Sequence, residues 1–522
     1  SSVVGVRPHV MAHAAPAPVS QADVVNRIPI TGALMLATLM NTLDSTIANV
    51  ALPHMKGSLG ASQDQITWVL TSYIIATAIM TPLSGWLSLK VGRKNMFLAC
   101  IAGFTAASAL CGVAQNLPEM VLFRFLQGVA GAALIPLSQT VMLDIYPQRL
   151  IPQVMSIWSA AVIMGPILGP AVGGWITENW SWRWCFYINV PIGALATLAL
   201  VSFMADDPGG RQRPFDFLGF GALATFVGAF QLMMDRGPDN DWFGSTETWI
   251  EAVVAGLAFW IFLIQTLTAD HPFFHRDLAK DRNFVTSTVF GLCVGGILFS
   301  TTAVLPSFMQ NLLGYSALQS GYASMPRGIG SLIAFLVMPY LMARIGPRRT
   351  LLIGIVLCTG ALWSMSHFDL DMTAGPIVTS GLIQGLGVGL LFSPLNILAY
   401  ATLNPVHRTE GTVVSTMLRS LGSSMGISVI QAQLTSSAAM AHARLGENLY
   451  AGAPALAAAG ANPSTAAGAA VLNGQLTQQA TMVGYVDVFS WMAVGTLFLL
   501  PLLLVMQAPP AAQIVPLEAA AE

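Results

Sequence analysis

Charged residues are scarce in this chain: they make up 9% of its 522 residues, whereas hydrophobic residues make up 54%. An ordinary soluble domain has about 25% charged residues, so this composition excludes a soluble globular protein. The net charge of -2 leaves no surplus of basic residues to neutralise phosphates, which excludes a nucleic-acid partner. The few charges that remain are therefore informative through their positions.

The patterns of enzymatic and metal sites are also missing. All five cysteines lie inside apolar stretches, without the spacing of metal ligands, and are expected to be buried apolar side chains. His271 and His275 lie in a loop interrupted by Pro272, and this arrangement does not predict a metal site. The chain has no P-loop motif and no nucleophile beside a base. We therefore expect no enzyme activity, no cofactor and no ATP hydrolysis by the chain itself.

Long apolar stretches dominate what is present. They recur from residue 30 to residue 507, and each is long enough to cross a hydrocarbon core about 30 Å thick. Glycine, proline and charged residues separate these stretches from one another. The pattern predicts an all-α membrane protein with fourteen transmembrane helices. If both termini are cytoplasmic, fifteen Lys and Arg residues fall in cytoplasmic segments and four in external ones. This asymmetry follows the positive-inside rule and supports an even number of spans.

The chain also repeats itself. Residues 127–138 read QGVAGAALIPLS and residues 384–395 read QGLGVGLLFSPL, and a short basic loop precedes each of them, LKVGRK at 89–94 and ARIGPRR at 343–349. Two related six-helix halves are a common design of secondary transporters. The predicted organisation is a cytoplasmic tail (1–29), a six-helix bundle (30–204), a linker with two inserted helices (205–285), a second six-helix bundle (286–507) with an external loop (436–480), and a cytoplasmic C-terminal tail (508–522). The Ala-, Gly-, Gln- and Ser-rich composition of that loop fits either a mobile loop or a pair of short amphipathic helices.

Asp44 lies within the first apolar stretch, where an ionised group costs about 2.5–3.5 kcal/mol at the bilayer centre. Asn41 and Ser45 share its face by helical spacing, so the three form a polar stripe that should face a cavity. A carboxyl in such a cavity can take up a proton from one side and release it to the other. The alternative is that Asp44 is a structural hydrogen-bonding residue between helices.

Arg124 lies in the fourth apolar stretch, with Gln127 one turn further along. Arginine keeps its charge, so it serves as a fixed positive partner. The matching position of the second half is Gly381, and a residue present in one half only is better explained by coupling than by architecture. Snorkelling to a nearby interface is the alternative.

Three further ionisable residues interrupt the second half. Arg327 and Arg419 are flanked by small residues, so a neighbouring helix can come close. Each can be either a structural tie between helices or a contact for substrate or another anion. Asp487 lies near the start of the last apolar stretch and is a weaker candidate, because acids near helix ends are usually solvated.

Several motifs resemble those of one family. They are LDSTIANVALP (43–53), GWLSLKVGRK (85–94), RFLQGVAGAA (124–133), GPILGPAVGG (165–174), WRWCFYINVPIG (182–193) and DRGPDNDWF (235–243). In this order they resemble the major facilitator superfamily, specifically the fourteen-helix drug:proton antiporter group that includes the EmrB-type exporters. The resemblance implies the major facilitator fold, with two six-helix bundles and an inserted helix pair.

The resemblance also implies roles for single residues. Asp44 is expected to be the proton-linked acid and Arg124 the coupling arginine. Gly85, Gly92 and Arg93 match the loop motif, but Leu89 stands where the family has an acid, so a charge relay through that acid is not expected. The antiporter motif, which marks export, is matched by Gly165, Pro166, Gly169, Pro170 and Gly174. Its small-residue spacing predicts a helix-packing seam that opens and closes.

These observations predict a proton-coupled multidrug exporter of the bacterial inner membrane. Its partners would be protons, lipophilic substrates and membrane lipid, and the resemblance implies a periplasmic adaptor protein and an outer-membrane channel. Two alternatives stay open at this point. One is a dedicated exporter of an endogenous metabolite, fatty acid or siderophore-like compound, and the other is a membrane receptor or scaffold that does not transport.

Overall fold

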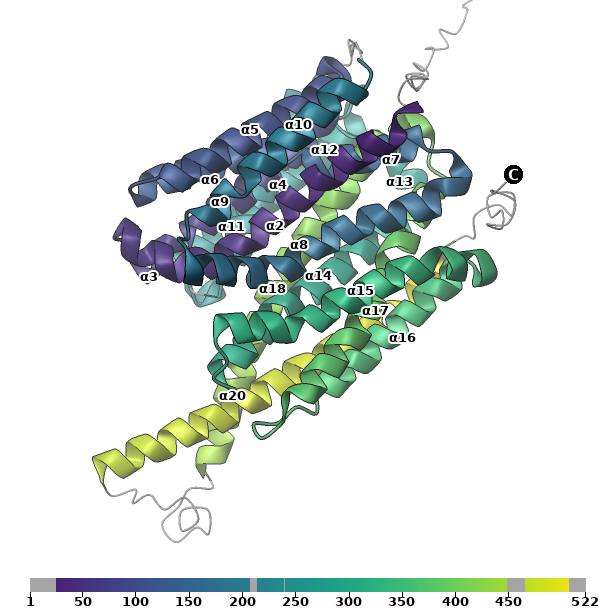
Figure 1. Ribbon diagram of the computed structural model, residues 1–522. Coiled ribbons are helices and arrows are strands. Elements are labelled where there is room, and N and C mark those ends of the chain that lie inside the picture. Colours follow the sequence, from purple (N-terminus) through teal and green to yellow (C-terminus); the bar gives the residue numbers. More distant parts are fainter. Residues whose placement is uncertain (1–24, 207–213, 239, 448–464, 507–522) are drawn as a thin grey trace, which may run out of the picture.

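Every element of the computed structural model in Figure 1 is a helix across the residues that it describes, which are 25–206, 214–238, 240–447 and 465–506. The predicted tails lie outside these ranges, except for residues 25–29. The first half contains α2 (Arg27–Leu59), α3 (Gln63–Ile66), α4 (Trp68–Val91), α5 (Arg93–Val113), α6 (Leu117–Gly131), α7 (Leu134–Ile145), α8 (Ile151–Asn179), α9 (Trp184–Tyr187) and α10 (Asn189–Phe203).

The second half repeats this pattern of long helices. It contains α14 (Arg282–Asn311), α15 (Ala317–Ile345), α16 (Pro347–Met365), α17 (Ala374–Ala401), α18 (Arg408–Glu447), α20 (Ala466–Leu497) and α21 (Leu500–Val505). Short basic loops separate α4 from α5 and α15 from α16, and each loop turns at a glycine of positive φ, Gly92 (91°) and Gly346 (80°). Only glycine adopts such a conformation without strain, so the backbone turns in the same way in these two related basic loops.

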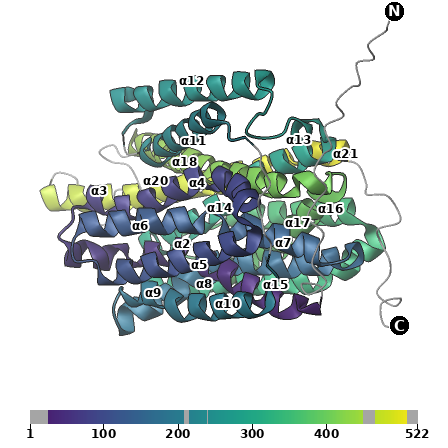
Figure 2. The ribbon, with the colours of Figure 1, turned by 90° about the horizontal axis from the view of Figure 1, so that it is seen from above.

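An extra helix pair separates the two halves in sequence. It consists of α11 (Phe217–Arg236) and α12 (Thr246–Thr268), and the short α13 (Asp277–Lys280) follows. Helix α11 packs against α4 of the first half and α18 of the second. Helix α12 packs mainly on α11 and lies at the edge of the molecule (Figure 2), with 11% of its most apolar window buried. Its exposed apolar surface suits contact with lipid.

Thirteen helices of the described residues are long and apolar enough to cross a membrane. Helix α2, with 33 residues, is also long, but polar residues such as Asn41 and Asp44 lower its hydropathy and it is not one of the thirteen. The fourteen predicted spans are these thirteen together with α2. Which side of the membrane the termini occupy stays a prediction.

The two halves meet closely along α8 and α15. A Cβ atom on Gly321 would lie 3.2 Å from the Cα of Ala171, and one on Gly328 would lie 2.6 Å from Cγ2 of Ile167. Near the start of α18, the hydroxyls of Thr140 and Thr412 are 2.7 Å apart and join α7 to α18 across the two halves. Small residues therefore allow the halves to touch through backbone and short side chains.

The segment predicted as an external loop, 436–480, is helical at both ends. Helix α18 continues to Glu447 and α20 begins at Ala466, while residues 448–464 lie outside the described residues. Alanine and glutamine are strong helix formers, which explains why the two spans continue as helices in this segment. In Figure 1 the yellow helix α20 projects beyond the rest of the bundle.

Candidate functional site

An ion pair joins α2 to α6 in the interior of the first half. Nη1 of Arg124 donates to Oδ2 of Asp44 at 2.6 Å, and both side chains are 0% exposed. Gly128, one turn after Arg124, allows α6 to approach α4, since a Cβ atom there would lie 2.5 Å from the carbonyl oxygen of Tyr73. Gly128 thus lets α6 lie close to α4, whose Val69 and Tyr73 contact the Arg124 guanidinium.

Two amide side chains complete the contacts of the Asp44 carboxylate. Nε2 of Gln127 and Nδ2 of Asn189 donate to Oδ1 at 2.9 and 2.8 Å. All three partners of the carboxylate are N–H donors, so the arrangement suits the ionised form, which is an acceptor only. The three donors therefore occupy both oxygens of the carboxylate.

Aromatic rings and a backbone carbonyl hold the Arg124 guanidinium from its other sides. Its Cζ lies 4.2 Å from the ring centre of Tyr73 and 5.6 Å from that of Phe186, and its Nε donates to the carbonyl oxygen of Val69 at 3.2 Å. Arginine over an aromatic face is attracted by the ring quadrupole, more strongly when water is absent. A movement of Arg124 would therefore break its contacts with α4.

The residues of the predicted polar stripe of α2 have different kinds of partners in the structure. Asn41 joins α2 to α4 and α6, because its Nδ2 lies 3.2 Å from both the Tyr73 hydroxyl and the Gly131 carbonyl oxygen. Ser45 instead donates to the carbonyl oxygen of Thr42 in its own helix at 2.8 Å. Asn41 thus lies beside the Asp44 site, whereas the hydroxyl of Ser45 is occupied locally.

The loop motif lies where the first half meets α18 of the second. Nη1 of Arg93 donates to Oδ2 of Asp144 at 2.5 Å, and Nη1 of Arg408 lies 3.4 Å from Oδ1 of the same carboxylate. A Cβ atom on Gly85 would lie 3.3 Å from Cγ2 of Val413 on α18. Asp144 therefore links an arginine of each half. No acid is available at Leu89 for this task.

The glycines of the antiporter motif pack α8 against α2. Cβ atoms on Gly165 and Gly169 would lie 2.2 and 2.1 Å from the hydroxyl oxygens of Thr42 and Thr46. Pro166 and Pro170 lie on the partly buried side of α8, which stays helical through both, and a Cβ atom on Gly174 would lie 4.0 Å from Leu318 of the second half. The seam that these glycines form directly is therefore one within the first half, beside Asp44.

The comparison with a family model decides the assignment of this fold. The model described as Major Facilitator Superfamily matches residues 34–427. The chain belongs to the major facilitator superfamily. It is 36% identical over 492 residues to the multidrug export protein EmrB of Escherichia coli K12, covering 92% of this chain and 95% of that protein. The predicted resemblance to EmrB-type exporters is confirmed.

Other relatives of this major facilitator chain extend the comparison. It is 32% identical over 488 residues to the fatty acid resistance protein FarB of Neisseria gonorrhoeae, covering 92% of this chain and 96% of FarB. The crystal structure of the human organic anion transporter MFSD10 (TETRAN) is similar with a TM-score of 0.61 at 13% identity, covering 92% of this chain and 99% of that one. This structural likeness shows the fold. The family and the thirteen apolar helices make the chain a multi-pass protein of the bacterial inner membrane.

The other predicted site residues lie in the second half of the major facilitator fold, away from Asp44. Arg327 ties α15 to α14, because its Nη1 donates to Oγ1 of Thr302 at 2.8 Å and its Nη2 to the carbonyl oxygen of Leu298 at 3.1 Å. Arg419 lies on α18, with its Cζ 5.4 Å from the ring centre of Phe392. Asp487 is partly buried on α20.

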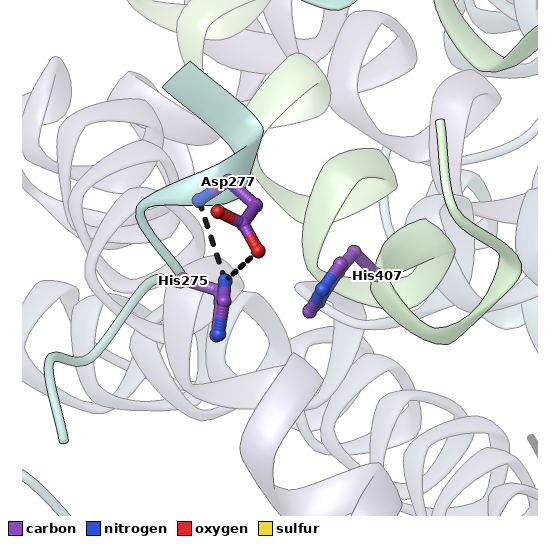
Figure 3. A group of neighbouring side chains, drawn as sticks. All are labelled: His275, Asp277 and His407. Carbon is purple, nitrogen blue, oxygen red and sulfur yellow. Dashed lines mark hydrogen bonds and ion pairs between the residues drawn. The ribbon is translucent and has the colours of Figure 1, made fainter. Parts of the chain in front are cut away.

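One group of side chains offers the atom types of a metal site. His275, Asp277 and His407 each have a candidate ligand atom, and these atoms lie within 4.8 Å of one another (Figure 3). The two imidazole rings are stacked with centres 4.4 Å apart and planes at 26°, so their nitrogen lone pairs run side by side and do not converge. Asp277 accepts a hydrogen bond from Nζ of Lys280 at 2.9 Å, which holds the pKa of that carboxyl below its usual range. We interpret the group as a contact between the linker and the segment before α18.

Two residues of the Asp44 site were not predicted from the sequence. Asn189 opens α10 and donates both to Asp44 and to the hydroxyl of Ser108, at 2.8 and 2.9 Å. Tyr73 faces the Arg124 guanidinium. The signal for Asn189 was a buried amide inside an otherwise apolar stretch, because such a group needs a polar partner.

Proposed function

We propose that this major facilitator chain is a proton-driven exporter of lipophilic compounds that works by alternating access. The observation that carries the proposal is the ion pair of Asp44 and Arg124, in which both side chains are 0% exposed. An ionisable group inside a membrane helix is costly and is retained where it binds an ion, a proton or a substrate. The similarity to EmrB over 92% of the chain supports export of drugs.

The contacts of Asp44 suggest how a proton could drive the cycle. In the arrangement seen here three N–H donors contact the carboxylate, and an ionised carboxylate, which only accepts hydrogen bonds, can use all three. Protonation would remove the attraction for Arg124 and leave a buried cation uncompensated, which favours a conformation in which Arg124 finds another partner. Binding and release of one proton thereby select between two arrangements of α2 and α6.

The relatives support a lipophilic substrate class, and the partners are part of the proposal. A lipophilic substrate would bind between the two halves, and its arrival would displace the proton from Asp44. Inward flow of protons would then reset the transporter. The EmrB-type resemblance implies a periplasmic adaptor protein and an outer-membrane channel that carry the compound beyond the periplasm.

The test is substrate-induced release of protons from the purified, detergent-solubilised protein. Wild type should acidify a weakly buffered solution when lipophilic cations, weak acids or fatty acids are added, and Asp44→Asn should not. Asp371→Asn is the matched control, because it makes the same chemical change at an exposed acid. Proton release by Asp44→Asn at the wild-type level would remove Asp44 from the mechanism.

A second candidate is a dedicated exporter of fatty acids. It is favoured by the 32% identity to FarB, which is named for fatty acid resistance. A narrow response in the same proton-release assay, confined to fatty acids, would select this function over multidrug export.

A further inference from the structure

Arg419 is a cation inside the second bundle whose charge the proposed mechanism does not use. Its Cζ lies 5.4 Å from the ring centre of Phe392, and its stem packs beside Gly295 of α14, where a Cβ atom would lie 3.1 Å from Cγ of Arg419. Within the part of the chain that the structure describes, no carboxylate pairs with this guanidinium and no acceptor binds it. The side chain is partly buried. A charged side chain within a membrane helix is costly and usually faces a water-filled cavity or a ligand, so an arginine without a partner in the chain indicates one of these.

A small, partly open cavity is lined by Arg419. Its volume is about 20 Å³, which is room for one water-sized group, and α14, α17 and α18 each contribute to its wall. The polar residues of the wall besides Arg419 are Asn396, Ser287, Thr288 and Ser415. No acidic side chain lines the cavity among the described residues.

Two of these polar side chains have unused hydrogen-bonding atoms. Asn396 is 6% exposed and its Nδ2 has no hydrogen-bond partner among the described residues, and the same holds for Oγ of Ser287, which is 2% exposed. A buried donor without an acceptor costs about 1–3 kcal/mol. Arg419, Asn396 and Ser287 all supply donors to one cavity, so the missing partner is an acceptor, and the arginine makes a negative charge the best match.

The other intramembrane arginines show what a satisfied site looks like. Arg124 binds the carboxylate of Asp44, and Arg327 binds Thr302 and a backbone carbonyl. Arg419 lacks partners of both kinds within the described chain. A purely structural tie would resemble Arg327, so the surroundings of Arg419 fit a site for an anion from outside the chain.

We propose that Arg419, Asn396 and Ser287 form a subsite for the carboxylate head group of an amphiphilic substrate. The planar guanidinium matches a carboxylate, and the apolar wall residues, such as Val294 and Leu395, suit the attached hydrocarbon. In the present conformation the cavity has room for one water-sized group, so both the carboxylate and its tail would enter only when the helices of its wall move apart. This inference rests on the proposed export function and specifies its substrate class.

The experiment measures binding to the purified full-length protein by calorimetry. The probes are decanoate, decyltrimethylammonium and decanol, which share a hydrocarbon chain and differ in head-group charge. Arg419→Gln should weaken decanoate binding at least tenfold, roughly 1.4 kcal/mol, and leave binding of the cation and the alcohol unchanged. Asn396→Asp should weaken decanoate binding as well, because it places a carboxylate in the cavity, and it serves as the second variant if Arg419→Gln does not fold.

Arg444→Gln is the matched control, since it removes the same charge from an exposed position of the same helix α18. Equal decanoate affinity in wild type, Arg419→Gln and Asn396→Asp would overturn the subsite. Chloride that stabilises wild type but not Arg419→Gln, without any binding of decanoate, would assign the cavity to an inorganic ion and overturn the substrate assignment.

Proton release induced by the lipophilic cation, measured on the same preparations, reports on the export function separately. Arg419→Gln that keeps this proton release and loses decanoate binding supports the subsite. Wild type that binds decanoate through Arg419 but releases no proton with any probe overturns the proposed coupling and leaves the subsite standing.

Discussion

Nη1 of Arg124 and Oδ2 of Asp44 lie 2.6 Å apart in the first bundle, with both side chains fully buried. A buried ion pair contributes little net stability compared with apolar or neutral groups of similar volume, because both charges lose their hydration. Removing one partner is far worse, because the other charge is then left alone. This energetic balance fits the proposed change of charge during the working cycle better than a role in the stability of the fold.

The first prediction concerns stability. Arg124→Gln alone should destabilise the protein by about 3–5 kcal/mol, since the Asp44 carboxylate would keep only two amide donors. The double variant Asp44→Asn, Arg124→Gln should recover most of this loss, because neither side chain is then charged. Thermal unfolding in detergent measures both effects. Arg282→Gln, an exposed site on α14, is the control for loss of one positive charge, and a double variant as unstable as the sum of the single ones would contradict the argument.

The second prediction concerns the link through Asp144. Asp144→Asn should weaken the contact between the two halves, because Arg93 and Arg408 would then lie close together without a shared carboxylate. A partly buried pair of this kind is worth about 1 kcal/mol. We therefore expect labelling of a cysteine introduced at Thr412 to become roughly fivefold faster in this variant.

Asp206→Asn supplies the control for the labelling experiment. Asp206, just after α10, pairs with Lys94 of the first half, and its side chain is 90% exposed. Its removal should leave the labelling rate at residue 412 unchanged. An equal acceleration by both variants would show that Asp144 acts through general surface charge and does not hold the halves together.

The sequence predicted the residues of the central ion pair better than it predicted their surroundings. Asp44 and Arg124 are charged residues in apolar stretches. Placing a charge inside a membrane helix costs free energy, so such residues can be identified as functional candidates without a structure. Asn189 and Tyr73 are neutral, and apolar stretches contain such residues for many reasons, so they give a weaker signal and were not predicted. Which groups meet depends on how α2, α4, α6 and α10 pack, and helical periodicity within one segment does not contain this information.

The same limit applies to the boundary between the halves. Asp144 lies at the end of its helix, where acids are usually solvated, yet it pairs with Arg408, which is 264 positions away in the sequence. The glycine spacing of residues 165–174 predicted close packing, but the partner of Gly165 is α2 of its own half. Spacing identifies a close contact and leaves the partner helix undetermined.

The third prediction concerns this seam. Gly165→Ala should destabilise the protein or displace α8 from α2, because its Cβ atom would lie 2.2 Å from Oγ1 of Thr42 and 2.5 Å from the backbone carbon of the same residue. Overpacking of this kind typically costs about 1–3 kcal/mol. Gly32→Ala is the matched control in a helix, since nothing lies within 4 Å of its Cβ position. A midpoint of thermal unfolding that falls equally in both variants would mean that loss of glycine, and not the contact, is responsible.

The last prediction tests movement between the halves directly. The hydroxyls of Thr140 and Thr412 are 2.7 Å apart, one from each half, so Thr140→Cys with Thr412→Cys should form a disulfide under oxidation. If transport requires the halves to separate here, the oxidised protein should stop transporting, and a reducing agent should restore the activity. The native cysteines are buried or partly buried, which limits competing reactions.

Thr38→Cys with Ser138→Cys is the matched control, because these hydroxyls are 3.0 Å apart within the first half and a bond between them leaves the halves free to move. Complete cross-linking between positions 140 and 412 with undiminished transport would show that this contact persists throughout the cycle, and alternating access would then have to proceed without opening at α7 and α18.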